Sequence, residues 1–194
     1  SDSSAASDVY KRQNLKSLTY ALERIKLKYR ISKVWSDLSN SRALILPGVS
    51  AAGNVMSNIR KLALEDRIRD FNKPVLGICV GMQVLYEHSD EENKTCLGLI
   101  PGVVKKFSNP KLAIPHMGWN MVNFLTSEFE DCSGHFYFAN SYHAPIDTYS
   151  LGYSEYGERF SAFVKQNNFY GVQFHPEKSS KLGEKFLTKF FEMA

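Results

Sequence analysis

The spacing of hydrophobic positions divides the chain into a first half of alternating helices and strands and a second half that is mostly strands. Helical spacing or helix-forming composition predicts helices over residues 15–28, 55–71, 80–88 and 181–191. Short apolar or alternating runs predict strands over residues 29–35, 43–46, 74–78, 103–107, 121–124, 136–139, 160–165 and 170–174. Such an order predicts one α/β domain with a mixed central sheet flanked by helices.

Residues 1–13 fit neither pattern. They are rich in Ser, Ala and Asp and show no sustained periodicity. We therefore interpret 1–13 as a non-native-looking or disordered N-terminal segment and place the domain at residues 14–194, where Asn14 is a typical helix N-cap.

Composition narrows the class of protein. Of 194 residues, 43% are hydrophobic and 23% are charged, which is ordinary for a globular domain, and the net charge is only +4. No apolar run approaches the roughly 18 residues of a membrane-spanning helix, and the N-terminus has no secretory signal pattern, so we expect a cytoplasmic protein. Scattered basic residues favour neither nucleic acid nor a membrane as partner.

The three cysteines, Cys79, Cys96 and Cys132, are far apart in the sequence. An odd set without CxxC spacing argues against a disulfide framework and against a zinc site, so we expect no metal and reduced thiols. Only Cys79 has a local context that indicates chemistry.

Cys79 stands at the centre of Gly77-Ile78-Cys79-Val80-Gly81, directly after an apolar strand and before a predicted helix. This is the G-x-nucleophile-x-G elbow with Cys in place of Ser, in which the flanking glycines make room for a sharp turn. A helix N-terminus favours the thiolate, which is the attacking species. A buried core cysteine is the alternative, but the strand before and the helix after favour a nucleophile, with the Val80 N–H as an oxyanion donor.

His175 is the favoured base for this nucleophile among five histidines. It follows the predicted strand 170–174, and Glu177 lies two residues further on, after the rigid Pro176. A carboxylate that holds one imidazole nitrogen leaves the other free to face a thiol. His-Pro-Glu alone could equally be a surface turn. Together with the elbow it predicts a Cys79–His175–Glu177 triad.

Two motifs carry a resemblance to a known family. Residues 77–83 (GICVGMQ) and 171–177 (GVQFHPE) resemble the class I, or triad, glutamine amidotransferases. Residues 97–103, 114–120 (IPHMGWN) and 137–142 further resemble the glutaminase subunit of imidazole glycerol phosphate synthase. The resemblance covers the chain from about residue 14 to the C-terminus, and the segment PHMGWN is its most specific element.

The resemblance implies a flavodoxin-like sheet and a glutaminase that needs no cofactor. It implies hydrolysis of L-glutamine to glutamate and ammonia, with ammonia passed to a (βα)8-barrel, HisF-like cyclase subunit that makes imidazole glycerol phosphate and an aminoimidazole carboxamide nucleotide in histidine biosynthesis. It also implies a second oxyanion donor at Gly48 and Val49, after strand 43–46. Glutamine is then expected at Gln83, Ser141 and Tyr142.

The segment around Trp119 is the predicted docking surface for the cyclase in a heterodimer. Exposed Trp and Met side chains are typical interface anchors, although a strand with a buried Trp is the alternative. The predicted interface residues are Pro115, His116, Met117, Trp119 and Asn120.

Three features depart from the family pattern. The opening hydrophobic strand is absent, and residues 1–13 stand in its place, so the first central strand is expected to be missing or replaced and the N-terminus poorly packed. Ser50 stands where the family usually has glycine, and Asn140 stands where it usually has histidine. These two substitutions keep open a paralogous amidotransferase that supplies ammonia for amidination of an amino sugar in surface-polysaccharide synthesis. A catalytically silent scaffold subunit is the alternative of another class.

Overall fold

The protein is described here by a computed structural model that covers residues 14–194. A first helix runs over residues 14–24. The other helices are α2 (Trp35–Leu38), α3 (Ala52–Lys61), α4 (Glu65–Arg69), α5 (Val80–Gln83) and α6 (Ser180–Met193), with the short 3-10 helices η1 (Glu91–Asn93), η2 (Glu130–Cys132) and η3 (Pro176–Lys178).

A seven-stranded mixed sheet forms the centre of the molecule. In spatial order it contains β1 (Leu44–Leu46), β2 (Val75–Ile78), β11 (Phe169–Val172), β10 (Arg159–Gln166), β9 (Ser150–Glu155), β6 (His116–Phe124) and β7 (Gly134–Asn140). The first three strands are parallel and the others pair antiparallel. A smaller sheet contains β4 (Lys94–Thr95), β3 (Tyr86–Ser89), β5 (Ile100–Lys106) and β8 (Tyr142–His143). The predicted α/β class with a mixed sheet and flanking helices is confirmed.

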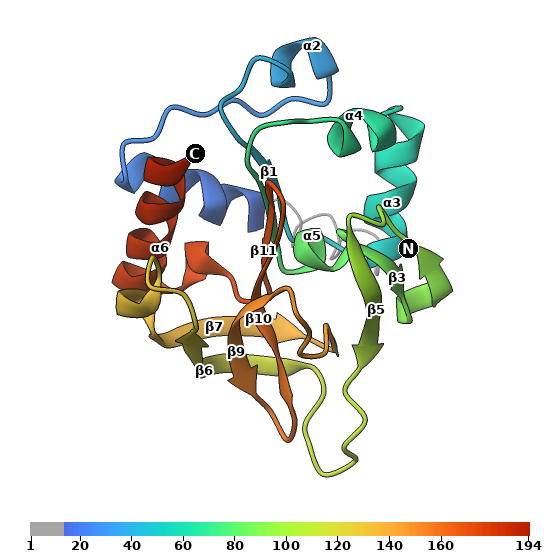
Figure 1. Ribbon diagram of the computed structural model, residues 1–194, viewed down its shortest axis with the longest axis vertical. Helices are drawn as coiled ribbons and strands as arrows, with labels where there is room; N and C mark the ends of the chain where they lie inside the picture. The colour runs from blue at the N-terminus through green and yellow to red at the C-terminus, as the bar shows by residue number, and fades with distance from the viewer. Residues whose placement is uncertain (1–13) are drawn as a thin grey trace.

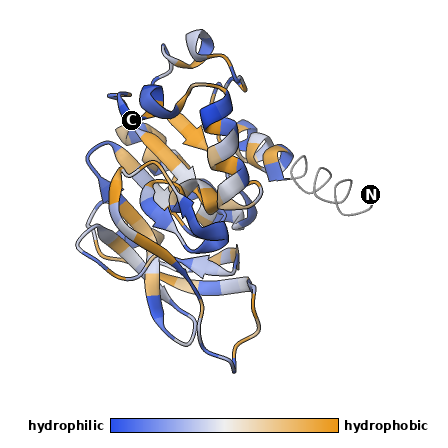
Figure 2. Ribbon diagram, turned by 90° about the vertical axis from the view of Figure 1, so that its right-hand side faces the viewer, coloured by the Kyte–Doolittle hydropathy of each residue, from blue (hydrophilic) through white to orange (hydrophobic). Residues whose placement is uncertain are grey.

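Helices cover both faces of the large sheet, which gives three layers (Figure 1). On one face, the first helix and α6 bury Leu18, Leu22, Phe186 and Phe190 in an aromatic-rich core. On the other face, α3, α4 and the small sheet close a second core that includes the fully buried Tyr86. Hydrophobic residues accordingly concentrate on the central strands (Figure 2), where burial on both faces explains their continuous apolar runs.

Three predicted elements differ from the structure. Residues 29–35 form no strand, and Trp35 instead begins α2. The predicted helix 55–71 is two helices, α3 and α4, because Ala63 has φ +51° between them and interrupts the hydrogen-bond ladder. The predicted helix 80–88 ends at Gln83 and becomes β3, since a fully buried apolar run has no periodicity that separates helix from strand.

The strand β1 is an edge of the large sheet among the described residues, where it pairs only with β2. Residues 29–35 do not pair with this edge. The expectation of a missing or replaced opening strand concerns residues 1–13, which lie outside the described residues. Within residues 14–194, no helix is long and apolar enough to cross a membrane.

Candidate active site

The turn between β2 and α5 presents Cys79 in a strained conformation. Cys79 has φ +53° and ψ −111°, a region that L-residues rarely adopt and that clusters at functional sites. A Cβ on Gly77 would collide with the Gly81 carbonyl, and a Cβ on Gly81 would collide with the Leu46 carbonyl. The two glycines are therefore required by close backbone approach, as the elbow motif predicts.

His175 and Glu177 form a buried pair next to this cysteine. His175 Nδ1 lies 2.7 Å from Glu177 Oε1, and both side chains are almost fully buried. Burial by itself would lower the pKa of His175. The charges of Cys79 and Glu177, and the hydrogen bonds that His175 makes with both, outweigh burial and raise this pKa to about 10. The structure thus brings Cys79 together with a histidine–glutamate pair that is almost a hundred positions further along the sequence, and these neighbours favour the protonated form of the imidazole.

Two glutamines link Cys79 to the substrate side of the pocket. Gln173 Nε2 lies 3.6 Å from Cys79 Sγ, and Gln83 Nε2 donates to Gln173 Oε1 at 3.0 Å and to the Tyr142 carbonyl at 2.9 Å. Gln173 is completely buried. The amide N–H of Gln173 therefore points at the sulfur and holds the Cys79 side chain at the edge of the pocket.

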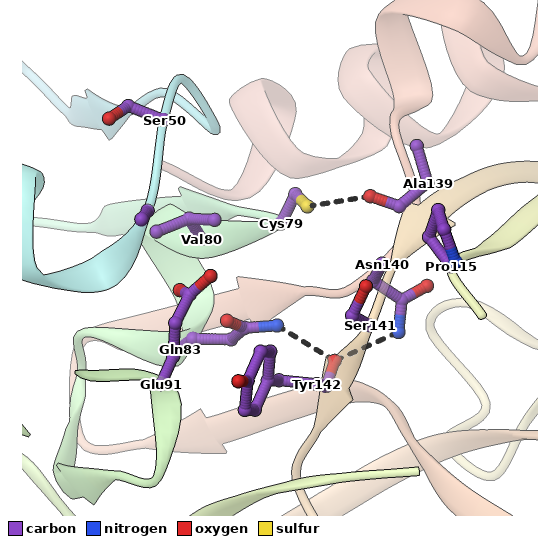
Figure 3. A pocket seen from close by; sticks show the side chains of 11 residues that line it. Ser50, Cys79, Val80, Gln83, Glu91, Pro115, Ala139, Asn140, Ser141 and Tyr142 are labelled. Carbon is purple, nitrogen blue, oxygen red and sulfur yellow. Dashed lines mark hydrogen bonds between the residues drawn. The ribbon is translucent and has the colours of Figure 1, made fainter. Parts of the chain in front are cut away.

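A cavity of about 170 Å³ opens beside Cys79 (Figure 3). The lining residues are Ser50, Ala51, Cys79, Val80, Gln83, Glu91, Pro115, Ala139, Asn140, Ser141 and Tyr142. Four predicted substrate and oxyanion residues, Val80, Gln83, Ser141 and Tyr142, are among them. No hydrogen bond within the described residues uses the Val80 N–H, so this donor is free at the elbow.

The expected second oxyanion donor at Gly48 and Val49 is not in place. Neither residue lines the cavity, and the Val49 N–H donates to the Pro47 carbonyl at 3.1 Å within a tight turn. Gly48 instead packs against the elbow, where a Cβ would meet the Ile78 carbonyl and Cys79 Cβ. In this conformation the loop faces the cavity with Ser50 and Ala51, and Ser50 has φ +92°, a value that favours glycine.

Two residues of the site were not found from the sequence. Gln173 stands inside the GVQFHPE motif, so its position was visible but its contact with sulfur was not. Glu91 carried no motif, and only the packing of η1 against α3 brings its carboxylate to the cavity. Burial raises the pKa of Glu91, while the Ala52 N–H lowers it by a smaller amount. The site therefore contains a half-buried carboxylate without a cationic partner among the described residues.

The strand β6 has one exposed apolar face. Met117, Trp119 and Met121 are 62%, 54% and 37% exposed, and Trp119 packs edge-on against Tyr137 of β7 at 6.2 Å. His116 does not belong to this face, contrary to expectation, because strand alternation turns it into the core. It stacks on Tyr156 at 4.0 Å and is only 4% exposed.

Pro115 and Asn120 complete the predicted docking segment. Pro115 is exposed and also lines the cavity. It directly precedes β6, so it lies between the predicted docking segment and the site. Asn120 is half-buried, and its Nδ2 donates to the Glu155 carbonyl at 2.8 Å. No group of three or more His, Cys, Asp or Glu side chains within residues 14–194 could hold a metal ion.

Comparison with known proteins identifies the family of the chain. The family model "Glutamine amidotransferase class-I" matches residues 7–194. The chain therefore belongs to the class I glutamine amidotransferase family. Its curated relatives include "Imidazole glycerol phosphate synthase subunit HisH" of Idiomarina loihiensis, 38% identical over 93% of each chain, and "Imidazole glycerol phosphate synthase subunit HisH 2" of Campylobacter jejuni strain RM1221, 41% identical over 92% of this chain and 93% of the relative.

Solved structures share the fold at much lower sequence identity. A structure described as "Crystal structure of glutamine amidotransferase" has a TM-score of 0.71 at 17% identity, and covers 92% of this chain and 94% of its own. "Structure of PurLQS from Thermotoga maritima" has a TM-score of 0.66 at 18% identity and covers 92% of each chain. These likenesses establish the amidotransferase fold.

Proposed function

We propose that the chain is the glutaminase subunit of an imidazole glycerol phosphate synthase of histidine biosynthesis, and that Cys79, His175 and Glu177 are its catalytic triad. The observation that carries the triad is the buried His175–Glu177 pair at 2.7 Å next to a cysteine in a strained elbow. The relatives named HisH support the assignment to this synthase.

In the first half of the reaction, the Cys79 thiolate attacks the side-chain carboxamide carbon of glutamine. The carbonyl oxygen becomes an oxyanion, which the free Val80 N–H stabilises. The tetrahedral intermediate collapses to a thioester as the C–N bond breaks. The raised pKa of His175 keeps a proton on the imidazole, which it gives to the departing nitrogen, so that ammonia leaves.

In the second half, His175 takes a proton from water, and the hydroxide attacks the thioester. Collapse of this intermediate releases glutamate and returns the thiolate. Glu177 holds the imidazole through Nδ1, so that the other ring nitrogen faces the sulfur in both halves. Across the cycle, glutamine and water give glutamate and ammonia.

The cavity lining explains how glutamine would be selected. Glu91 supplies a carboxylate for the α-ammonium group of the substrate, and the backbone at Ser141 and Tyr142 faces the same space. The exposed face of Met117, Trp119 and Met121 is the proposed docking surface for a (βα)8-barrel cyclase subunit in a heterodimer. Pro115 lies between this face and the cavity, so a partner there would sit next to the ammonia source.

The test is to reconstitute the chain with its cyclase and compare two nitrogen sources. Cys79→Ala should abolish glutamine-dependent product formation and leave ammonium-dependent formation intact, because only the glutaminase half uses the thiolate. Cys132→Ala, which removes a buried thiol that does not line the cavity, is the matched control and should retain both activities. Glutamine-driven turnover by Cys79→Ala would reject the triad.

The second candidate for the ammonia acceptor is an amino sugar that is amidinated in surface-polysaccharide synthesis. Its support is chain-specific: Ser50 and Asn140 line the cavity at positions where the family usually has glycine and histidine. Growth of a HisH-deficient strain without histidine, restored by this chain, supports the histidine pathway, and failure of a well-expressed chain to restore it supports the second acceptor. Absence of Cys79 labelling by an electrophilic glutamine analogue, with the cyclase bound, would favour a silent scaffold over both.

A further inference from the structure

Glu91 lies between two parts of the site that the mechanism treats as separate. Its carboxylate lines the cavity, and its Oε2 also accepts a hydrogen bond from the Ala52 N–H at 2.8 Å. Ala52 is the first residue of α3, whose leading N–H groups have no partner within the helix. Glu91 therefore caps this helix from another element, 39 positions away in the sequence.

The helix that Glu91 caps continues directly from the loop beside the nucleophile. Residues 47–51 connect β1 to α3, and Ser50 and Ala51 of this loop line the cavity opposite Cys79. The Ala51 N-cap position has no side-chain cap of its own. Within the loop, only a bond between Asn54 Nδ2 and Ser50 Oγ, at 2.9 Å, ties this end to the helix by a side chain. The carboxylate of Glu91 thus holds the backbone N–H at the point where the loop enters α3, and the carboxylate of Glu92 lies against Gly53 in the same turn.

We propose that Glu91 is a positioning residue that clamps the first turn of α3 and thereby holds the oxyanion loop, residues 47–51, against the Cys79 elbow. The proposal rests on the proposed glutaminase function and adds a second role to the residue that faces the substrate ammonium. Oε2 holds the Ala52 N–H, and Oε1 is left for the cationic substrate. The same carboxylate then binds the substrate and fixes the position of the loop.

Two substitutions of Glu91 separate the cap on the Ala52 N–H from the contact with the substrate ammonium. Glu91→Gln keeps an amide oxygen that can accept from the Ala52 N–H, but it loses the charge that attracts an ammonium. Glu91→Ala loses both the acceptor and the charge. Glu130→Gln is the control, because it removes a carboxylate charge from an exposed side chain on η2 that does not line the cavity.

Steady-state glutaminase kinetics of the complex should show this separation. We expect Glu91→Gln to raise KM for glutamine about tenfold or more with kcat little changed, since it loses a charge-assisted contact made equally by substrate and transition state. Glu91→Ala should raise KM similarly and also lower kcat by about tenfold or more, since the loop that it releases lines the cavity with Ser50 and Ala51 and packs Gly48 against the elbow that presents the nucleophile. Glu130→Gln should behave as wild type.

Glutaric acid monoamide, which is glutamine without its amino group, removes the ammonium role from the comparison. With this substrate, wild type and Glu91→Gln should have equal kcat/KM, and Glu91→Ala should still be slower. Equal kcat for Glu91→Ala and Glu91→Gln on both substrates would overturn the clamp and leave the proposed function standing. The Cys79→Ala experiment tests that function independently.

Hydrogen exchange gives a readout that does not depend on activity. Amide exchange over residues 50–54 should be faster in Glu91→Ala than in wild type, and Glu91→Gln should stay near wild type, because it retains the cap of the Ala52 N–H. Unchanged exchange in Glu91→Ala would overturn the clamp, whatever the kinetics show.

Discussion

The elbow at Cys79 and the exposed strand β6 differ in how tightly their residues are surrounded. Around the elbow, glycines and polar side chains are buried, and close backbone contacts fix nearly every atom. Along β6, large apolar side chains are exposed, and Gly118, with φ +126°, has no atom within 4 Å of where a Cβ would lie. At the elbow, the protein's own packing limits which residues the chain can carry. On β6, the positive φ of Gly118 and the exposure of the apolar side chains set that limit instead.

The two buried histidines repeat this contrast. His175 at the site has charged partners that raise its pKa to about 10, whereas burial lowers the pKa of His116 on β6 to about 4, despite an opposing hydrogen bond with Asn140. One imidazole is thus held charged for chemistry, and the other is held neutral for packing.

The largest effect is expected from Gly81→Ala. Its Cβ would collide with the Leu46 carbonyl, a backbone atom that cannot move aside cheaply. We expect a loss of about 1–3 kcal/mol in the free energy of unfolding, measured with urea, and a larger proportional loss of glutaminase activity. Gly118→Ala, strained only by its φ, should cost less. Equal costs for the two variants would break the comparison between the regions.

A large effect on binding, but not on folding, is expected from Trp119→Ala. Removing an exposed aromatic anchor should weaken cyclase binding by about 2 kcal/mol, or roughly thirtyfold in Kd, measured by titration calorimetry. The melting temperature of the isolated chain should barely change. Ile31→Ala, which truncates a similarly exposed side chain elsewhere on the molecule, is the control and should bind as wild type. Loss of stability without loss of binding would assign Trp119 to the core.

A smaller effect is expected in the pH dependence of stability through His175. Its folded-state pKa is raised, so its contribution is complete below the ordinary value of 6.5 and is lost as pH rises through this value towards about 10. Urea unfolding from pH 6 to 10 should show this decline. Cys79→Ser should flatten it, since the thiolate that raises the pKa is gone. The same slope in both proteins would mean that other groups cause the decline.

The smallest effect is expected from His116, with the opposite sign. Its folded-state pKa is lowered to about 4, so the unfolded state takes up more protons between pH 6.5 and 4, and stability falls as pH falls through this window. His116→Phe, which keeps a ring for the stack on Tyr156, should reduce the fall in urea midpoint over this range. If the urea midpoint of His116→Phe fell with pH as steeply as that of the wild type, the His116 imidazole would not be the cause of the fall.

Much of the site could be predicted from local sequence, because residues that are adjacent in the chain determine the geometry of each part. The elbow around Cys79 needs small residues next to the nucleophile, and His175-Pro176-Glu177 fixes a carboxylate beside an imidazole within three residues. The strands β2 and β11 were visible for the same reason, since burial on both faces demands continuous apolar runs.

Only the tertiary structure decided features that depend on distant neighbours. It placed Glu91 at the cavity through the packing of η1 on α3, turned His116 inward, and put Gly48 against the elbow instead of in the cavity. It also left residues 29–35 without strand structure, because a strand forms only where another backbone lies beside it. The sequence determined which groups could do chemistry, and folding decided which of them share a space, because burial and hydrogen bonding depend on residues that are far apart along the chain.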